Sequence, residues 1–308
     1  MRNIATVVTD YRLIAKITHR AGVVLLMLLV LSNCASRNTE IKTVTSKSNA
    51  NKQWLVSLPK PWQLSKPQLA EILPQFHSRY PKFQERYRAL AHWRLGTPYK
   101  IFNLGEESGP DLDPIFRLDV SDCTSHVLST LSLAQSKNWT EARQNMIRIN
   151  YKTSDDGIKK PTYESRWHYT SDRIMNHTST PSIMTNVIDE SQLTVQTITL
   201  NQKQDGSEFL KLGWRQTVDV RYIPNQHITK ELLQKLPNLT GVAFVKSSYF
   251  KMGIVTAHEG LIIDGKSLLH AGQSAGETVI EDFMDYYFTD QGAKFSGIML
   301  YELLPMAK

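Results

Sequence analysis

A cysteine stands at the start of an apolar run with helical spacing, and this run constrains the fold more than any other stretch. After Asp122, apolar side chains recur every three or four residues, which places them on one face of a helix. Ser121 or Asp122 is the expected N-cap, so Cys123 falls in the first helical turn. The apolar positions are Val127, Leu128, Leu131 and Ala134. We therefore expect a helix that begins at Cys123 and buries one face.

The position of Cys123 suggests a nucleophile. Unpaired backbone N–H groups and the helix dipole favour negative charge at a helix start, which predicts a thiol pKa below the free value of about 8.5. The alternative is that Cys123 is a small buried hydrophobic residue, as many free cysteines are. A basic side chain close to Cys123 would favour the interpretation that Cys123 is a nucleophile.

Helical patterns fill the first half of the chain and strand patterns the second. We expect helices over 83–94, 139–149, 163–177, 228–236 and 281–288. Alternating or β-branched segments predict strands over 193–200, 217–223, 242–246, 255–263, 267–271 and 297–303. This order is typical of an α+β domain, with N-terminal helices packed on an antiparallel sheet.

The N-terminus has the pattern of an export signal. A basic segment to Arg20 precedes the apolar run 21–31, and Leu31-Ser-Asn-Cys34 resembles a bacterial lipobox, although Asn33 departs from the usual small residue. We expect residues 1–33 to be a lipoprotein signal peptide and Cys34 to be lipidated. A non-lipidated exported form and an uncleaved anchor are the alternatives.

The polar segment 34–53 is expected to be a flexible tether, and 54–308 a single domain. The predicted location is periplasmic and membrane-anchored.

The net charge and the cysteine content limit the classes of partner that the chain can have. The chain of 308 residues has a formal charge of +7, and about +4 remains once four basic residues and one acidic residue before position 34 are removed. This dispersed excess suits an acidic polymer such as a cell wall and does not indicate nucleic acid. Two cysteines exclude a framework of structural disulfides. We expect a monomer.

Two histidines are expected to lie on neighbouring strands. His258 and His270 flank Asp264-Gly-Lys, a hairpin signal, and both can face the same side. One histidine could take the thiol proton and return it to a leaving amine, while the other holds its imidazole. Zinc is the rival chemistry, because Cys123, His258 and His270 could supply three ligands, but no close-spaced cysteine or histidine pair supports it. We expect no metal and no cofactor.

The order of these motifs resembles the NlpC/p60 papain-like cysteine peptidases of bacterial cell walls. The motifs are Leu95-Gly-Thr-Pro-Tyr99, Asp122-Cys123, His258-x-Gly260 and His270-Ala271. The segments 164–169, 220–224 and 297–301 resemble the branch whose members look like N-acetylmuramoyl-L-alanine amidases. The resemblance implies a papain-like core with insertions and cleavage of the amide between the muramic acid lactyl group and L-alanine, through a thioester on cysteine.

The resemblance also implies residue roles. Cys123 matches the nucleophile, His258 the general base and acid, and His270 the residue that orients it. Tyr99 matches a tyrosine that helps hold the oxyanion, with a ring packed on the cysteine helix as the alternative. Arg166 and Asp122 are candidate substrate-binding residues; for Arg166 the alternative is a surface ion pair.

Departures from the family pattern occur beside the expected cleft. Lys100-Ile-Phe follows Tyr99 without the usual glycine pair, Glu259 replaces a valine after the base histidine, and His126 stands where an apolar residue is common. We expect His126 to be exposed. These departures remove no catalytic atom, so they concern how a substrate would fit and not which atoms would react.

Two other functions stay open. The same chemistry could cut the bond between D-glutamate and the diamino acid of the stem peptide, as endopeptidase relatives do. A lipoprotein that binds the wall without cutting it is the non-enzymatic alternative.

Overall fold

The computed structural model of this chain describes residues 49–153, 157 and 160–306. The chain divides into two compact units, Met1–Leu58 and Pro59–Lys308. In the first unit, residues 49–57 are helical, so the end of the predicted tether differs from the irregular chain expected there. The signal segment, Cys34 and the rest of the tether lie outside the described residues. Among the helices that are described, none has both the length and the apolar character needed to cross a membrane.

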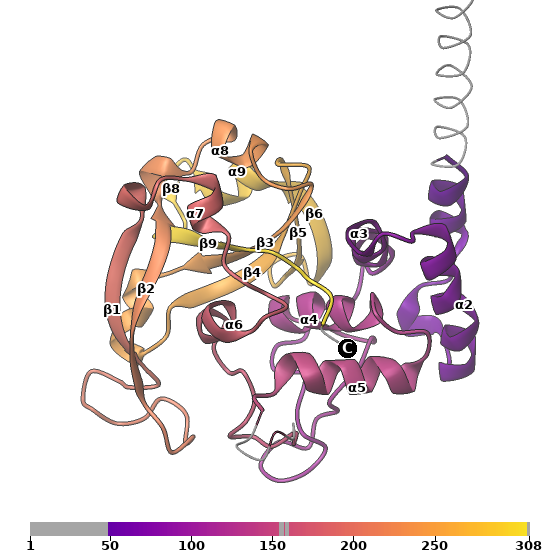
Figure 1. Cartoon of the computed structure of the whole chain (residues 1–308), viewed down its shortest axis with the longest axis horizontal. Coiled ribbons are helices and arrows are strands. Elements are labelled where there is room, and N and C mark those ends of the chain that lie inside the picture. Colours follow the sequence, from indigo (N-terminus) through magenta and orange to yellow (C-terminus); the bar gives the residue numbers. More distant parts are fainter. Residues whose placement is uncertain (1–48, 154–156, 158–159, 307–308) are drawn as a thin grey trace, which may run out of the picture. The chain divides into compact units, whose positions relative to one another are not determined.

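The second unit is organised around a seven-stranded sheet. Its strand order is β1-β2-β9-β3-β4-β5-β6, and every neighbouring pair is antiparallel (Figure 1). Strands β3 and β9 are buried along their whole length, which places the core at the centre of the sheet. The expected combination of helices with an antiparallel sheet is therefore confirmed. The strands are β1 Thr194–Leu200, β2 Gln216–Pro224, β3 Leu239–Val245, β4 Thr256–Ile263, β5 Ser267–Gly272, β6 Glu277–Asp282, β7 Phe288–Thr289, β8 Gly292–Ala293 and β9 Gly297–Tyr301.

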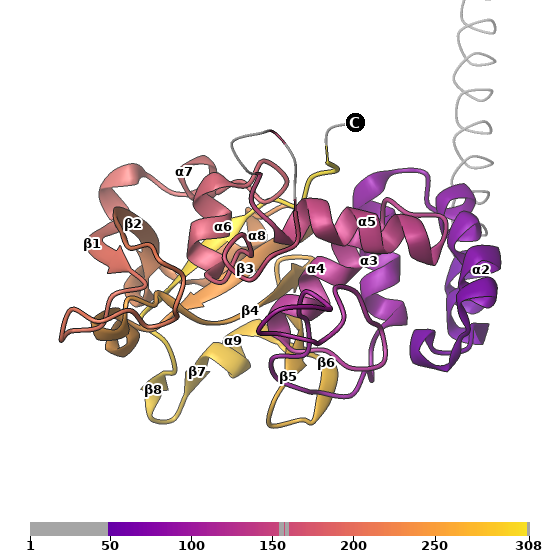
Figure 2. The same cartoon turned by 90° about the horizontal axis from the view of Figure 1, so that it is seen from below.

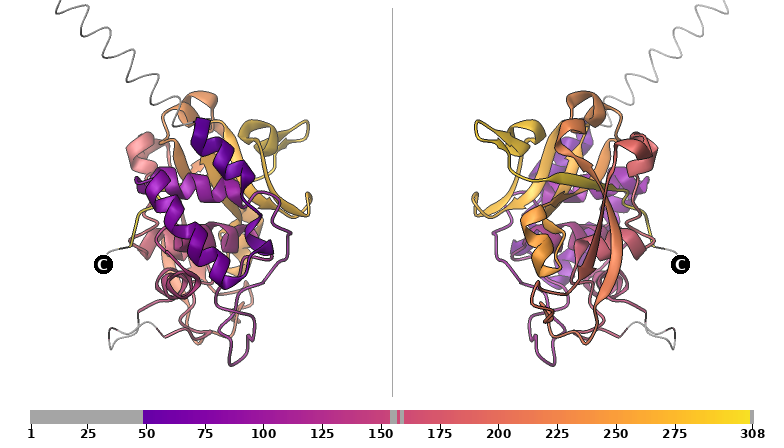
Figure 3. Two further views of the ribbon diagram at one scale, coloured as in Figure 1. Left: turned by 90° about the vertical axis from the view of Figure 1, so that its right-hand side faces the viewer. Right: turned by 90° about the vertical axis from the view of Figure 1, so that its left-hand side faces the viewer.

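The cysteine helix α4 packs on β4 and β5, and α3 and α5 pack against α4 (Figures 1 and 3). The side chains of α4 are buried from Ser125 to Leu133, because sheet and helices enclose it. The α-helices are α2 Lys66–Arg79, α3 Phe83–Trp93, α4 Cys123–Leu133, α5 Trp139–Asn150, α6 Thr170–Asn176, α7 Met184–Val187, α8 Lys230–Gln234 and α9 Phe283–Tyr287. The 3-10 helices are η1 Pro61–Gln63, η2 Glu190–Gln192, η3 Asn225–His227 and η4 Ser247–Met252.

The helix expected over 163–177 is much shorter in the structure. Only α6, Thr170–Asn176, is helical, and the residues before it are held in an extended connection. Arg166 forms a bridge with Tyr151, and the amide of Trp167 donates to the carbonyl of Asn150 at 2.9 Å. The backbone groups that a helix would use internally are therefore paired with the end of α5.

The hairpin of β4 and β5 forms as expected. Asp264 and Gly265 both have positive φ, 52° and 60°, and the amide of Lys266 donates to Ile263 O at 3.1 Å. Positive φ at both central residues matches the right-handed twist of the flanking strands. The tight turn makes the two strands immediate neighbours.

The helix expected over 281–288 begins later than predicted. Strand β6 continues through Asp282, and the side chain of Asp282 then caps α9 by accepting from the amides of Met284 and Asp285. Glu281 is therefore a strand residue beside β5, where it pairs with Leu268. This correction moves a carboxylate into the neighbourhood of the histidines.

Helix α9 lies beside the sheet (Figure 2), and aromatic side chains connect the two. Phe244 on β3 lies 5.6 Å from His258, 6.0 Å from Phe283 and 4.7 Å from Phe295, measured between ring centroids. Their burial fixes α9 against the strand that carries His258.

Candidate active site

Cys123 is the first residue of α4 and its thiol is free. Asp122 is the N-cap: its Oδ1 accepts from the amide of Ser125 at 2.8 Å, and Ser125 Oγ accepts from the amide of Asp122 at 2.8 Å. This reciprocal capping box satisfies two of the backbone donors at the helix start. The sulfur is thereby fixed at the end of a rigid helix.

The thiol is not acidified, contrary to the expectation from its position. Burial, followed by the negative charges of Asp122 and Glu259, raises the pKa of Cys123 to about 12, while the backbone of Glu259 acts in the opposite direction. The prediction of a lowered thiol pKa is therefore wrong for this structure. Tertiary burial and two carboxylates outweigh the helix start, and the resting thiol is neutral.

His258 and His270 meet in a direct hydrogen bond. His258 Nε2 lies 2.7 Å from His270 Nδ1, and the two rings are nearly perpendicular. The approach depends on Gly260, because a Cβ there would lie 2.9 Å from the Cβ of His270. The motif His258-x-Gly260 therefore has a steric reason in this hairpin.

Glu281 extends this pair into a chain of three. His270 Nε2 lies 2.7 Å from Glu281 Oε1, and the side chain of Glu281 is 44% exposed while that of His270 is 3% exposed. Sequence reasoning missed Glu281 because its segment was assigned to a helix. The β-branched run Thr278-Val-Ile280 was the signal that could have indicated a strand.

Both histidines are neutral near pH 7. Burial, and then the neighbouring His270, lower the pKa of His258 to about 3. Burial also lowers the pKa of His270, against the opposing effect of Glu281. At rest the site therefore contains a neutral thiol and two neutral imidazoles.

The thiol lies beside β4, the strand that carries His258. Cys123 responds to both the carboxylate and the backbone of Glu259, the residue that follows His258. Tyr286 on α9 is near both histidines, since its ring lies 6.0 Å from that of His258 and 4.8 Å from that of His270. The pKa of Tyr286 is raised by burial and then by Glu281 and Cys123, which places the hydroxyl near these two groups. Tyr286 was also missed by sequence reasoning.

Tyr99 lies near the nucleophile as part of a fixed loop. Its pKa is raised to about 12 by burial and then by Cys123 and Asp122. Its amide donates to Gly276 O at 2.8 Å, and the amide of Lys100 donates to Ser121 O at 3.1 Å. Both the oxyanion role and the packing role remain compatible with this position.

Asp122 also holds the loop that follows Tyr99. Its Oδ2 accepts from the amide of Phe102 at 3.0 Å, while Phe102 has a positive φ of 52° and is 80% exposed. In the structure Asp122 therefore joins the start of α4 to this loop. Its two carboxylate oxygens are both engaged within the protein.

Arg166 is committed to partners inside the protein. Its guanidinium lies 3.1 Å from Glu106 and 2.9 Å from Asp111, and it donates to the carbonyl of Leu104 at 2.5 Å. The side chain is 13% exposed. It is therefore part of a mostly buried ion-pair network, which leaves little of it to clamp a substrate carboxylate.

His126 is buried, and the expectation that it is exposed is wrong. Its side chain has no exposed surface, its Nδ1 lies 3.5 Å from Thr278 Oγ1, and burial lowers its pKa well below the usual value. The helix spacing did not show that β6 covers this side of α4.

Glu259 points away from the histidines into the core. Its carboxylate accepts from Arg173 at 2.6 Å and from the hydroxyl of Tyr301 at 2.8 Å, and all three residues are buried. Neighbouring residues of a strand face opposite sides of the sheet. His258 and Glu259 thus belong to two different environments.

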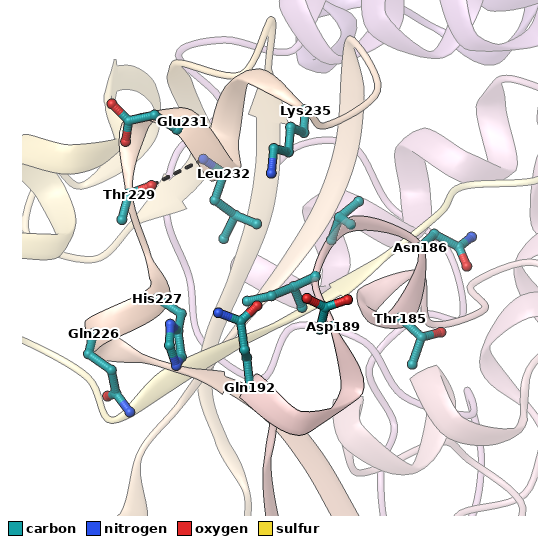
Figure 4. Close-up of a pocket in the computed structure, with 12 residues that line it drawn as sticks. Thr185, Asn186, Asp189, Gln192, Gln226, His227, Thr229, Glu231, Leu232 and Lys235 are labelled. Carbon is teal, nitrogen blue, oxygen red and sulfur yellow. Dashed lines mark hydrogen bonds between the residues drawn. The ribbon is translucent and has the colours of Figure 1, made fainter.

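A separate pocket of about 540 Å³ lies between the segments 185–192 and 226–235 (Figure 4). Asp189, His227 and Lys235 are among the side chains that line it, and Thr229 caps α8 at its wall. Neither Cys123 nor the two histidines line this pocket. It does not belong to the candidate active site.

The zinc alternative finds no support in the described part of the chain. No group of three or more histidine, cysteine, aspartate or glutamate side chains there is arranged to hold a metal ion. His258 Nε2 and His270 Nδ1 face one another, so these two atoms cannot bind a common ion.

Comparisons with known proteins identify a family from the sequence and a shared fold from the structure. The model of the AmiA-like family, described as N-acetylmuramoyl-L-alanine amidase-like, matches residues 89–293. A Legionella pneumophila protein of family DUF1460 has a TM-score of 0.62 and 19% identity, over 78% of this chain and 94% of its own.

Two Bacteroides structures are also similar. An N-acetylmuramoyl-L-alanine amidase from Bacteroides uniformis has a TM-score of 0.52 and 17% identity, over 72% of this chain and 99% of its own. A Bacteroides fragilis protein named as a candidate xylanase has a TM-score of 0.54 and 22% identity, over 70% and 99% of the two chains. At these identities the similarity establishes the fold alone. No curated protein matches the sequence.

Proposed function

Since this chain belongs to the AmiA-like family, described as N-acetylmuramoyl-L-alanine amidase-like, we propose that it is a peptidoglycan hydrolase that cleaves the amide between N-acetylmuramic acid and L-alanine. The observation that carries the proposal is the hydrogen-bonded chain His258–His270–Glu281, together with a cysteine at a helix start that interacts with the backbone of Glu259, the residue after His258. A base oriented by a third group beside a nucleophile is the arrangement of covalent catalysis.

In the proposed mechanism Cys123 attacks the lactyl carbonyl carbon while His258 Nδ1 takes the thiol proton. Because the thiol and imidazole are neutral at rest, proton transfer accompanies attack instead of preceding it. His258 Nε2 is already bound to His270, and Nδ1 has no hydrogen-bond partner within the described chain. Nδ1 is therefore the nitrogen left to act as base.

The tetrahedral intermediate carries an oxyanion. The backbone N–H of Cys123 at the start of α4 and the hydroxyl of Tyr99 are the proposed donors. When the C–N bond breaks, protonated His258 gives its proton to the departing L-alanine nitrogen. The muramoyl acyl group remains on sulfur as a thioester.

Hydrolysis completes the cycle. His258 takes a proton from water as the water oxygen attacks the thioester carbonyl, and the proton then returns to the leaving sulfur. The products are the free muramic acid carboxylate and the intact stem peptide. We further propose that this chemistry is that of the NlpC/p60 papain-like peptidases, which the order of the cysteine and the two histidines supports.

Mass spectrometry of muropeptides incubated with the full chain in detergent tests the proposal. We expect the wild type to release intact stem peptide and Cys123→Ala to release none. A peptide split after D-glutamate would replace the amidase assignment with the endopeptidase one. Binding to the wall without any cleavage under reducing conditions would favour the non-enzymatic lipoprotein.

We also propose that the protein is exported and anchored to a membrane by a lipid on Cys34, which the basic segment, the apolar run and Leu31-Ser-Asn-Cys34 support. Mass spectrometry of the N-terminal peptide from the membrane fraction would test this. A diacylglyceryl group on Cys34 is expected, and it should be absent in Cys34→Ala. An unmodified Cys34, or a peptide that begins before it, would contradict the proposal.

A further inference from the structure

The two hydrogen bonds of the histidine chain have a direction. A neutral imidazole has one N–H donor and one acceptor nitrogen, whereas an ionised carboxylate only accepts. Glu281 Oε1 lies 2.7 Å from His270 Nε2, so this nitrogen must carry the proton when the carboxylate is ionised. His270 Nδ1 is then an acceptor.

The position of the proton on His270 in turn determines the position of the proton on His258. His270 Nδ1 lies 2.7 Å from His258 Nε2, and because it is an acceptor, His258 Nε2 must be the donor. In a neutral ring, a proton on Nε2 leaves Nδ1 with a free lone pair. This is the nitrogen that the proposed mechanism requires to be unprotonated.

The opposite arrangement satisfies the bond between the histidines equally well. If His270 carried its proton on Nδ1, it would donate to His258 Nε2, and His258 would then hold its own proton on Nδ1. That nitrogen could not accept the thiol proton. The two arrangements differ in what His270 Nε2 offers, and Nε2 faces Glu281.

We propose that Glu281 is a positioning residue that selects between these arrangements, so that His258 presents an unprotonated Nδ1 to Cys123. A third group that sets a histidine tautomer is a general device in catalytic and metal sites. The role in catalysis rests on the proposed function, whereas the tautomers themselves do not.

The surroundings of His270 favour this role over a purely structural one. Glu281 stabilises the protonated form of His270, and Lys294 opposes it. Lys294 Nζ lies over the ring of Tyr286, 4.4 Å from its centroid, and this ring packs against His270. The carboxylate is 44% exposed, and β6 is paired with β5 through its backbone, so the fold does not depend on this side chain.

Nitrogen-15 NMR of the full chain in detergent tests the tautomers directly. At pH 7 we expect His258 and His270 to carry their protons on Nε2, with His258→Asn used to assign the base. In Glu281→Gln, which both accepts and donates, we expect a substantial population of His258 protonated on Nδ1. Glu277→Gln is the matched control, since Glu277 is an exposed glutamate on the same strand and no side-chain hydrogen bond of it is described.

Two NMR results would overturn the proposal. One is a wild-type His258 with its proton on Nδ1, and the other is a Glu281→Gln protein whose histidine tautomers equal those of the wild type. Neither depends on a substrate, so a failure of the amidase proposal leaves this test intact.

Kinetics then separate positioning from structure. We expect Glu281→Gln to lower kcat about 10- to 100-fold with little change in KM, as losses of an orienting partner typically do. Glu281→Asp should recover part of the rate, and Glu277→Gln should equal the wild type. If Glu281→Gln changed KM alone, or left both constants unchanged, the positioning role would be wrong.

Discussion

His258 and Glu259 are consecutive residues of β4, yet they face two different kinds of polar cluster. On one side His258, His270 and Glu281 form a chain that ends at a half-exposed carboxylate. On the other, Glu259, Arg173 and Tyr301 form a sealed ion pair in the core. The first cluster reaches the surface at Glu281, and the second is enclosed. The difference shows that charge burial alone does not identify a catalytic group.

The largest expected effect is the loss of activity when a residue of the histidine cluster is replaced. His258→Ala removes the proposed base, and general acid–base catalysis is worth about 10²- to 10⁴-fold in rate. We expect kcat/KM on muropeptides to fall by that factor while the variant still unfolds cooperatively in urea. An unfolded variant, or one with wild-type rates, would contradict the assignment of His258.

The second effect is on stability. Glu259→Ala leaves Arg173 buried without its carboxylate, and breaking a buried ion pair by removing one partner costs about 3–5 kcal/mol. We expect a loss of this size in the free energy of unfolding, measured by urea denaturation. Glu281→Ala is the comparison, and because its carboxylate is half-exposed it should lose far less. Equal losses of unfolding free energy in the two variants would contradict the expected difference between the clusters.

A third test replaces the whole sealed cluster. The triple change Glu259→Val, Arg173→Met and Tyr301→Phe removes both charges and the hydroxyl of Tyr301, and leaves only the half-buried hydroxyl of Thr170, 3.3 Å from Glu259, without that acceptor. Apolar replacement of a complete buried pair is often neutral or stabilising, so we expect an unfolding free energy within about 1 kcal/mol of the wild type. Because Glu259 raises the pKa of Cys123, alkylation of the thiol by iodoacetamide at pH 7 should also become faster. A slower alkylation rate would contradict this electrostatic link.

A fourth test uses pH. The pKa of His258 is lowered to about 3 in the fold, below the ordinary value of 6.5, so the unfolded chain binds more protons below pH 6.5. This contribution to stability is complete above pH 6.5 and is lost as the pH falls toward 3, with a slope of about 1.4 kcal/mol per pH unit for each extra proton. Urea unfolding between pH 7 and 4 should show a shallower slope for His258→Gln than for the wild type. His126 remains in both proteins and contributes equally. Identical slopes would mean that His258 is not buried in its neutral form.

The smallest effect concerns the loop beside the nucleophile. Phe102 has a positive φ, which glycine adopts without the steric cost that a bulky residue pays. We expect Phe102→Gly to raise the free energy of unfolding by about 1 kcal/mol, because 80% of the side chain is exposed and contributes little packing. A matched Ile101→Gly, at a position outside the positive-φ residues, should destabilise the protein instead. Destabilisation by Phe102→Gly would show that its ring has a packing role.

The hairpin and the cysteine helix were predictable from local pattern. The apolar spacing after Asp122 gives the start of α4 correctly, and Asp264-Gly265 specifies the tight turn that makes β4 and β5 neighbours. Such signals depend on residues a few positions apart. Pairing of His258 with His270 follows from them without any long-range information.

The missing parts depend on contacts between distant segments. Glu281 was assigned to a helix because its segment continues into α9, and only the cap at Asp282 shows where the helix begins. The sign of the pKa shift at Cys123 depends on burial and on Glu259, which stands far along the chain. The burial of His126 was missed for the same reason, since Thr278 on β6 lies against it. Two acidic residues engage Arg166, whose candidate role in substrate binding stays a prediction.

Asp122 joins the loop that follows Tyr99 to the helix that begins at Cys123. One carboxylate oxygen holds the amide of Ser125 in the first turn of α4, and the other holds the amide of Phe102. A displacement of the loop therefore pulls on the turn that carries Cys123. A substitution of Asp122 would therefore release the backbone at Phe102 and the first turn at Cys123 together, although the two lie about twenty residues apart in the sequence.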